Sequence, residues 1–333
     1  MRIALLAMPG SMKSAIAGLS DMFWLANQVI AQNPGVSSAS VLSEPLFNVK
    51  VISQDGQSVS DAQGRRIECD DAFPDNETFD LIIASGMRLD EEKCPVDREA
   101  LADAAVWIKA HALRGTRVAG ACAGGFVLAE AGLLDGRKCA TTWWLYHTLT
   151  ERYPRAKPIW GRVLVEDDNV ITTGGPLSWV DLVLYVVREC AGPEAARLTA
   201  DMAVADSQPL SQHLYAPARF RQSSHPLLIK AENLVRYQNP SITVEQLAAA
   251  LSMTSRTLNR KMAELVHESP KTFITRVRIE TATLMLEKPG STIYQVASAC
   301  GYSDETAFRR AFSTIMGMTP GNYKEWVRSR AGR

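Results

Sequence analysis

The sequence of 333 residues lacks the cysteine patterns of a disulfide framework or a zinc site. Its six cysteines are scattered, none forms C-x-x-C, and none has a histidine at ligand spacing. Long apolar runs are missing as well. The first one, IALLAM, ends at Pro9-Gly10 and is too short for a signal peptide, and no run approaches the ~18 residues of a membrane span. We therefore expect a cytoplasmic protein without a metal site or another cofactor.

An excess of charge of either sign is also missing, because the formal net charge is zero. This total conceals an asymmetry. Residues 223–333 carry 15 Lys and Arg against 9 Asp and Glu, a net of +6, whereas residues 1–222 carry 21 against 27, a net of −6. The basic C-terminal third points to an anionic partner, nucleic acid first, although a solvated basic face is the alternative.

The N-terminal part of the chain alternates strand-like and helix-like segments. The strand candidates are 2–7, 48–53, 80–84, 116–121, 161–165 and 169–173, and the helix candidates are 15–32, 97–113, 124–132, 143–152 and 176–191. This alternation predicts a layered α/β domain with a mainly parallel sheet. We expect it to span residues 1–205, followed by a polar, proline-rich linker at 206–226 and a helical domain at 227–333.

The helical domain contains an internal repeat. Apolar residues recur at i, i+3, i+4 and i+7 from Val244, and the same pattern recurs 49 residues later from Ile293. A turn and a second helix follow each copy, now offset by 50 residues, so the second turn, which holds Gly301, is one residue longer. A short helix, a tight turn and a second helix make a helix-turn-helix. Two copies joined by a helical run from about 270 to 288 predict binding to double-stranded DNA rather than a purely structural helical hairpin.

The outward faces of the two second helices carry side chains that can recognise bases. They are Ser255, Arg256, Asn259 and Arg260 in the first copy and Thr306, Arg309 and Arg310 in the second. Arg can donate two bonds to guanine and Asn can pair with adenine. We expect Thr254 or Ser255 to cap the first of these helices and Ser303 to cap the second. Since Asp304 and Glu305 oppose phosphates, the second helix should specify less. The two helices should enter successive major grooves, ~34 Å apart.

A cysteine stands at the bend between a strand and a helix of the α/β domain. Gly120, Cys122 and Gly124 form G-x-C-x-G, which is the nucleophile-elbow pattern with cysteine in place of serine. The bend places Cys122 beyond the carboxyl end of a strand, where ligands of such sheets bind. Catalysis also needs a base, and the local sequence places no histidine beside Cys122. Three hypotheses remain: a sensor domain without turnover, residual cysteine chemistry such as oxidation sensing, and a domain that only dimerises.

Residues 227–326 resemble the AraC/XylS-type DNA-binding domain. The segment VASACGYSDETAFRRAFSTIMGMTPGNYK carries most of this resemblance. The resemblance implies that Arg256, Asn259 and Arg260 read bases in the first copy and that Thr306 and Arg310 occupy DNA-contact positions in the second. His267 stands where the family usually has glycine, as this chain has at Gly317.

The α/β domain resembles the PfpI-like class I glutamine amidotransferase-like superfamily, which has a flavodoxin-like fold. The segments CAGGFVLAEAGLLDGRKCATTWW and ITTGGPLSWVDLVLYVV carry the resemblance. With the helical domain attached, the chain resembles GlxA-type transcriptional regulators of the AraC group. Ala123 and Trp143 stand where enzymes or relatives of the superfamily have histidine. The resemblance therefore implies a transcriptional regulator, an activator, and not an enzyme. The alternative is a cysteine-dependent hydrolase or amidotransferase-like enzyme with a DNA-binding appendage.

The same resemblance implies that a small-molecule effector binds at the elbow and that the α/β domain forms a homodimer. The expected effector-binding residues are Cys122, Ala123, Gly86, Asp21 and Trp143. An aromatic face beside Asp21 would suit a cationic ligand, with amines, amino acids and betaines as candidates. Tryptophan is more often a core residue than a ligand cage, so a structural role for Trp143 is the alternative.

Overall fold

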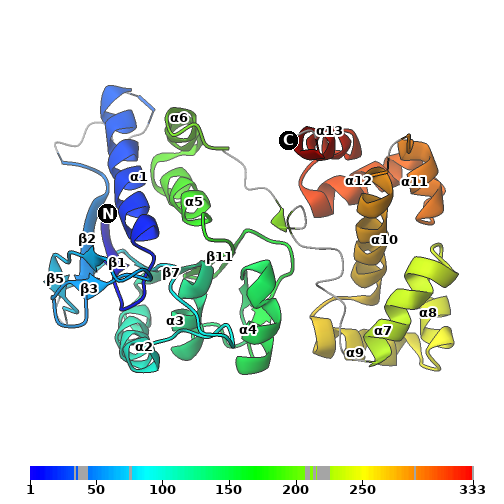
Figure 1. Ribbon diagram of the computed structural model, residues 1–333, viewed down its shortest axis with the longest axis horizontal. Helices are drawn as coiled ribbons and strands as arrows, with labels where there is room; N and C mark the ends of the chain where they lie inside the picture. Colours follow the sequence, from blue (N-terminus) through cyan, green and yellow to red (C-terminus); the bar gives the residue numbers. More distant parts are fainter. Residues whose placement is uncertain are drawn as a thin grey trace. The chain divides into compact units, whose positions relative to one another are not determined.

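The computed structural model describes residues 1–33, 35–36, 44–74, 77–206, 211–212, 215, 226–288 and 290–331. The chain divides into two compact units, Met1–Gln212 and His213–Arg333, called here the N-terminal and C-terminal units (Figure 1). The border between them falls inside the segment 206–226 that the sequence predicts as a linker. Among the described helices, none combines the length and the hydropathy needed to cross a bilayer.

A seven-stranded sheet forms the centre of the N-terminal unit. Its strands, in spatial order, are β10 (Leu164–Asp167), β11 (Val170–Thr173), β7 (Arg117–Ala121), β6 (Leu81–Ala84), β1 (Arg2–Leu6), β2 (Asn48–Ser53) and β5 (Asp71–Ala72). Neighbouring strands are parallel except for the β10–β11 pair. Every residue of β6 is buried, as expected for a strand covered on both faces. The predicted layered α/β fold is therefore confirmed.

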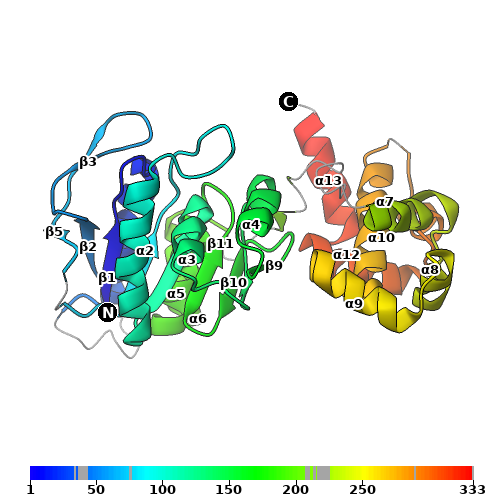
Figure 2. The same ribbon diagram turned by 90° about the horizontal axis from the view of Figure 1, so that it is seen from below.

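Helices cover both faces of this sheet, as Figure 2 shows. On one face lie α1 (Lys13–Gln32), α5 (Trp179–Ala191) and α6 (Pro193–Met202), and on the other lie α2 (Arg98–Leu113), α3 (Gly125–Glu130) and α4 (Tyr146–Arg152). Each layer has its own apolar core, built around Phe23 on the first face and Phe126 on the second. Two short ladders, β3 (Val59–Ser60) with β4 (Arg66–Ile67) and β8 (Lys138–Cys139) with β9 (Lys157–Pro158), lie outside the main sheet.

The N-terminal unit differs from the prediction in several details, among them the unpredicted short strands β3, β4, β5, β8 and β9. The strand expected at 161–165 begins only at Leu164, because Gly161 has a φ of +77° and lies in a turn. The helix α6 was not predicted. It follows α5 directly after Gly192, which has a φ of +96°, and its first residue is Pro193, a favourable residue at a helix start.

The C-terminal unit is helical throughout its described elements. These are α7 (Pro226–Asn233), a π-helical turn η5 (Leu234–Gln238), α8 (Val244–Ala250), α9 (Ser255–Val266), α10 (Pro270–Leu286), α11 (Ile293–Ala299), α12 (Glu305–Met316) and α13 (Pro320–Ala331). The pairs α8–α9 and α11–α12, called here the first and second motifs, confirm the predicted repeat, and α10 joins them. The motifs begin alike, because Thr243 with Gln246 and Thr292 with Gln295 each form a capping box.

Candidate functional site

The turn between β7 and α3 has the geometry of a strained elbow. Cys122 begins the 3-10 turn η2 (Cys122–Gly124) with a φ of +55°, a conformation that non-glycine residues rarely adopt. Glycine is required on both sides of it. A Cβ on Gly124 would lie 2.0 Å from the carbonyl oxygen of Ala84, and one on Gly120 would lie 2.9 Å from the backbone of Gly125. The close packing of β6, β7 and α3 therefore holds Cys122 at the carboxyl edge of the sheet.

The Cys122 thiol is held as a neutral group. Burial raises its pKa, which the hydroxyl of Thr142 and the backbone N–H groups of Ala123 and Gly175 partly offset. Thr142 Oγ1 donates to Cys122 Sγ over 3.4 Å. None of the groups that act on the pKa of Cys122 is an imidazole. A partly buried thiol with a raised pKa and no cationic partner is a weak nucleophile, because the thiolate is the reactive form.

The two histidines described in this unit belong to other surroundings. His111 is buried on α2 with its ring centroid 4.3 Å from that of Trp107, and His147 lies on α4 with its ring 5.6 Å from that of Tyr146. Across the described residues, no group of three His, Cys, Asp or Glu side chains could hold a metal ion.

The structure brings most of the predicted effector-binding residues together at the elbow. A Cβ on Gly86 would lie 3.8 Å from Cys122 Sγ, and Ala123 follows Cys122 with its N–H directed at the sulfur. Trp143 directly follows Thr142, the residue that donates to the thiol. Asp21 lies elsewhere. It is exposed on α1, nine residues beyond Met12, whose N–H donates to Gly86 O, which is about 13 Å along the helix axis.

The elbow also includes a residue that the sequence did not reveal. Gln212, within the predicted linker, has a side chain that is only 5 % exposed. Its Nε2 donates to the carbonyl oxygens of Thr141 (2.9 Å) and Arg162 (2.7 Å), and its Oε1 accepts from the N–H of Trp143 (2.8 Å). Gln212 therefore holds the backbone on both sides of Thr142, the residue whose hydroxyl contacts the thiol.

A separate cavity of about 330 Å³ opens at the same edge of the sheet, beyond the ends of β1 and β2. The residues that line it include Met8, Gln54, Asp55, Ser60 and Phe73. One acidic and one aromatic residue are thus among its lining residues, the combination that we expected of Asp21 and Trp143.

The second helix of each motif, α9 and α12, is called here the first and the second recognition helix. The predicted outward face of α9 is exposed. Leu258 and Met262 of α9 are fully buried, whereas Ser255, Arg256, Asn259, Arg260 and Ala263 are all exposed. The helix is capped by Thr254, whose hydroxyl accepts from the N–H of Thr257. The Glu264 carboxylate lies 3.9 Å from the Arg260 guanidinium, and both side chains are largely exposed. This face therefore presents Arg and Asn side chains to solvent.

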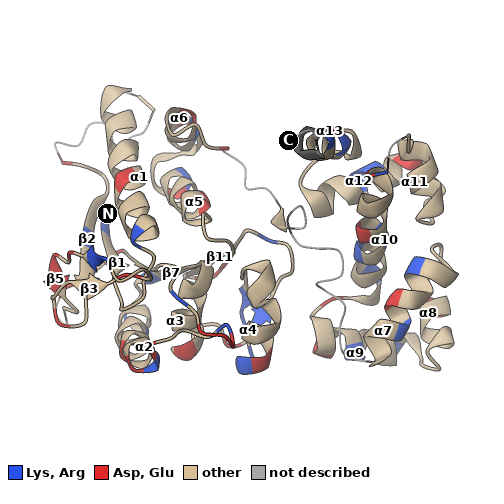
Figure 3. Ribbon diagram, in the orientation of Figure 1, with Lys and Arg blue, Asp and Glu red and all other residues tan. Residues whose placement is uncertain are grey.

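The second recognition helix differs from the prediction at its cap. Asp304 is the N-cap of α12 instead of Ser303, because its two carboxylate oxygens accept from the N–H groups of both Thr306 and Ala307. Thr306, Arg309 and Arg310 are exposed as predicted. Arg309 pairs with Glu305 at 2.6 Å, one helical turn earlier. Figure 3 shows that Lys and Arg residues also mark α10 and α13 in this unit.

Both recognition helices end in a left-handed residue, His267 in α9 and Gly317 in α12. His267 has a φ of +53°, and its Nδ1 donates to the carbonyl oxygen of Ala263 over 3.1 Å. The departure from glycine therefore keeps the helix-end geometry and adds one hydrogen bond.

Replacement of His267 by glycine should raise the free energy of unfolding of the C-terminal unit by up to about 1 kcal/mol. Glycine removes the left-handed strain of roughly 1–2 kcal/mol, and the lost hydrogen bond offsets part of it. Calorimetry of the two proteins measures the difference. The matched control is Gly317→His, which should destabilise. A destabilised His267→Gly protein would show that the hydrogen bond outweighs the strain.

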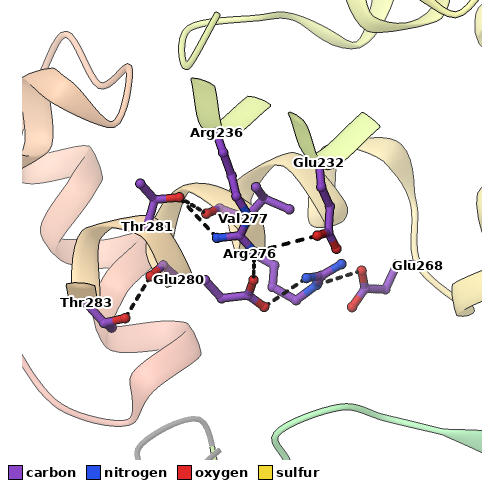
Figure 4. Close-up of polar contacts among 8 residues, drawn as sticks. All are labelled: Glu232, Arg236, Glu268, Arg276, Val277, Glu280, Thr281 and Thr283. Atoms are coloured by element: carbon purple, nitrogen blue, oxygen red, sulfur yellow. Dashed lines mark hydrogen bonds and ion pairs between the residues drawn. The ribbon is translucent and has the colours of Figure 1, made fainter. Parts of the chain in front are cut away.

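A buried ion cluster holds the exit of α9 against α10 (Figure 4). The Arg276 side chain is 5 % exposed and contacts Glu268 at 3.1 Å and Glu280 at 2.8 Å. Arg236 of η5 contacts Glu280 from the other side and lies 3.9 Å from Glu232. Burial lowers the pKa of Arg276, but the carboxylates of Glu268 and Glu280 outweigh this and hold it above its usual value. The cluster joins the start of the unit to the segment between α9 and α10.

Two family models match the chain, one in each unit. The DJ-1/PfpI family model matches residues 24–189, and a helix-turn-helix domain model matches residues 247–325. These matches confirm the sequence-based resemblances to the PfpI-like and AraC-type domains.

Two relatives are similar along both units. The chain is 26 % identical over 279 residues to the HTH-type transcriptional regulator CdhR of Pseudomonas aeruginosa, covering 83 % of this chain and 81 % of that protein. It is 24 % identical over 309 residues to the HTH-type transcriptional regulator GlxA of Rhizobium meliloti, covering 91 % and 92 %. Isonitrile hydratase of Pseudomonas putida is 31 % identical over 160 residues, covering 47 % of this chain and 65 % of that enzyme.

Proposed function

Because the chain joins a DJ-1/PfpI-family domain to an AraC-type helix-turn-helix domain, it is a DNA-binding transcriptional regulator, and we propose that its N-terminal unit senses a small metabolite without catalysing a reaction. The regulator acts in the cytoplasm as a homodimer and as an activator. The exposed face of α9 carries the DNA-binding part of this function. Its reading residues are Ser255, Arg256, Asn259 and Arg260, assisted by Thr306, Arg309 and Arg310 on α12.

The neutral state of Cys122 supports sensing rather than turnover. A hydrolase or amidotransferase would need a base that removes the thiol proton, and the groups that act on this thiol are hydrogen-bond donors. Cys122 keeps its strained backbone conformation although no such base is among the groups that act on its thiol. Residues held in such conformations often belong to binding sites, where the strain arranges the backbone for a ligand. Cys122, Ala123, Gly86 and Trp143 form the proposed effector site.

The effector is proposed to be an amine, an amino acid or a betaine. The cavity lined by Asp55 and Phe73 offers a carboxylate and a ring for a cationic group, and it lies at the same edge of the sheet as the elbow. A thermal-shift screen of the full-length protein with these three compound classes tests the proposal. A compound that binds only the folded state raises stability by RT ln(1 + [L]/Kd). The variant Asp55→Asn separates the two positions, because it should remove the shift only if the cation sits in the cavity.

Replacement of Cys122 by serine should leave both DNA binding and the effector response intact, because a passive thiol supplies only packing and a hydrogen-bond acceptor. Cys122→Trp should instead fill the elbow and abolish the response, while DNA binding without effector remains. A reporter assay of both variants, with intact-mass spectrometry of the wild type and its screened effector, measures this. A stable adduct on Cys122, or loss of response in Cys122→Ser with unchanged affinity for the effector, would favour the cysteine-dependent enzyme instead.

A further inference from the structure

Segments far apart in the sequence meet at the side chain of Arg278 in the C-terminal unit. Arg278 lies on α10, the helix between the two motifs. Its Nε donates to the carbonyl oxygen of Pro240 (2.5 Å) and its Nη2 to that of Ile242 (3.0 Å), in the loop just before α8. Its guanidinium carbon lies 5.7 Å from the ring centroid of Tyr302, in the turn between α11 and α12. One half-buried side chain therefore contacts the second motif and the loop that leads into the first.

The second motif also approaches this loop through its backbone. Gly301, with a φ of +80°, lies so close that a Cβ there would be 2.2 Å from the carbonyl oxygen of Pro240 and 2.6 Å from the nitrogen of Ser241. The loop is braced from within, since Asn239 Oδ1 accepts from both the N–H and the hydroxyl of Ser241. The second motif therefore packs backbone on backbone against the loop that leads into the first motif, which leaves little room for adjustment.

We propose that this contact, formed by residues 240–242, Arg278 and residues 301–302 and called here the junction, fixes the position of α12 relative to α9. The junction thereby sets the spacing that the protein accepts between the two DNA segments it contacts. The inference rests on the proposed function of these helices in DNA binding. It assigns Arg278 a positioning role, because its planar, two-pronged donor group is occupied by protein carbonyls.

The spacing selectivity arises because a rigid protein cannot follow a change in the distance and the rotation between two contacted DNA segments. One base pair inserted between two contacted segments moves the second by about 3.4 Å and turns it by roughly 35°. Two motifs linked only by a flexible connection could follow such a change. Two motifs locked at the junction cannot, so the second helix loses its contacts. Spacing selectivity should therefore depend on Arg278 although the bases themselves are read elsewhere.

The test begins with a library of randomised duplex DNA, selected with the full-length wild-type protein and footprinted to locate the two protected segments. Duplexes with one base pair inserted or removed between these segments are then compared by fluorescence anisotropy. We expect the wild type to lose at least about tenfold in affinity for the altered duplexes. Arg278→Gln should bind the original and altered duplexes within about threefold of each other.

Arg328→Gln is the matched control. Arg328 occupies the position on α13 equivalent to Arg278 on α10, 50 residues later, and its side chain is exposed. This variant removes the same charge from the same unit, so it should keep the wild-type spacing penalty. Arg278→Lys, which keeps the charge but lacks the planar, two-pronged donor group, serves if Arg278→Gln fails to fold by circular dichroism, and it should show a reduced penalty.

The possible results distinguish a failure of this inference from a failure of the proposed DNA-binding function. A wild type that tolerates altered spacing, or a folded Arg278 variant that keeps the full penalty, overturns the role of the junction. A wild type that selects no sequence from the library overturns the DNA-binding function itself. Loss of the penalty in Arg328→Gln as well would show that charge, and not the junction, sets the spacing.

Discussion

Arg276→Ala should lower the free energy of unfolding of the C-terminal unit by about 3–5 kcal/mol, the range for breaking a buried ion pair from one side. The substitution removes the cation between Glu268 and Glu280 and leaves their carboxylates in the interior with one neighbouring charge fewer. The guanidinium also lies over the Phe273 ring, 4.9 Å from its centroid, so packing is lost too.

The control for this variant is Arg309→Ala. Arg309 also pairs with a glutamate, but its side chain is 45 % exposed and the pair lies on the surface of α12. An exposed pair of this kind contributes about 0.3–0.5 kcal/mol. Differential scanning calorimetry of the full chain, with the two units resolved as separate transitions, measures both effects. Equal shifts in the two variants would mean that the buried cluster adds no more than a surface pair.

Arg260→Ala should weaken binding to the selected DNA by about 1–3 kcal/mol, or roughly 5- to 150-fold, and relax the base preference at one position. Arg260 is exposed on the outward face of α9, and an arginine there can donate two hydrogen bonds to guanine. The affected position should be the same in every selected sequence, because one side chain reaches one base pair.

Arg310→Ala is the comparison for Arg260→Ala. On α12, beside the acidic cap, Arg310 is expected to contact phosphates more than bases. Its loss should weaken binding evenly across sequences and reduce the dependence of log affinity on log salt by about 1. Titrations at two salt concentrations distinguish the two patterns. An Arg260→Ala protein that binds as tightly and selectively as the wild type would show that another face of the unit reads the bases.

Local patterns predicted the surfaces of the helices well. The 3.6-residue period buries Leu258 and Met262 and leaves Asn259 and Arg260 outside, because one core covers one face of α9. The elbow was predictable for a similar reason, since its glycines are demanded by backbone contacts within a short stretch. The cap of α12 was wrong by one residue. Two acceptable caps were adjacent, and only the structure shows that Asp304 satisfies two N–H groups at once.

Contacts between distant parts of the chain were beyond these patterns. Gln212 binds backbone groups 50 to 71 residues away, and no local signal marks this glutamine, among the three of the polar segment, as buried. Arg278 likewise finds its carbonyl partners 36 and 38 residues away. Asp21 shows the converse. Its sequence position suggested a charge near the elbow, and the length of α1 carries it away from there.

The anchoring of Gln212 has a practical consequence for exchanging domains between regulators of this kind. A sensor cut after residue 205, at the end predicted from composition, would leave behind the side chain that satisfies Thr141, Trp143 and Arg162. In the chimera, the carbonyl groups of Thr141 and Arg162 and the N–H of Trp143 would then lose this partner and be open to water. A sensor domain that ends after residue 212 keeps Gln212 and its three hydrogen bonds. We therefore expect successful chimeras to be cut after residue 212, so that Gln212 stays in the sensor domain.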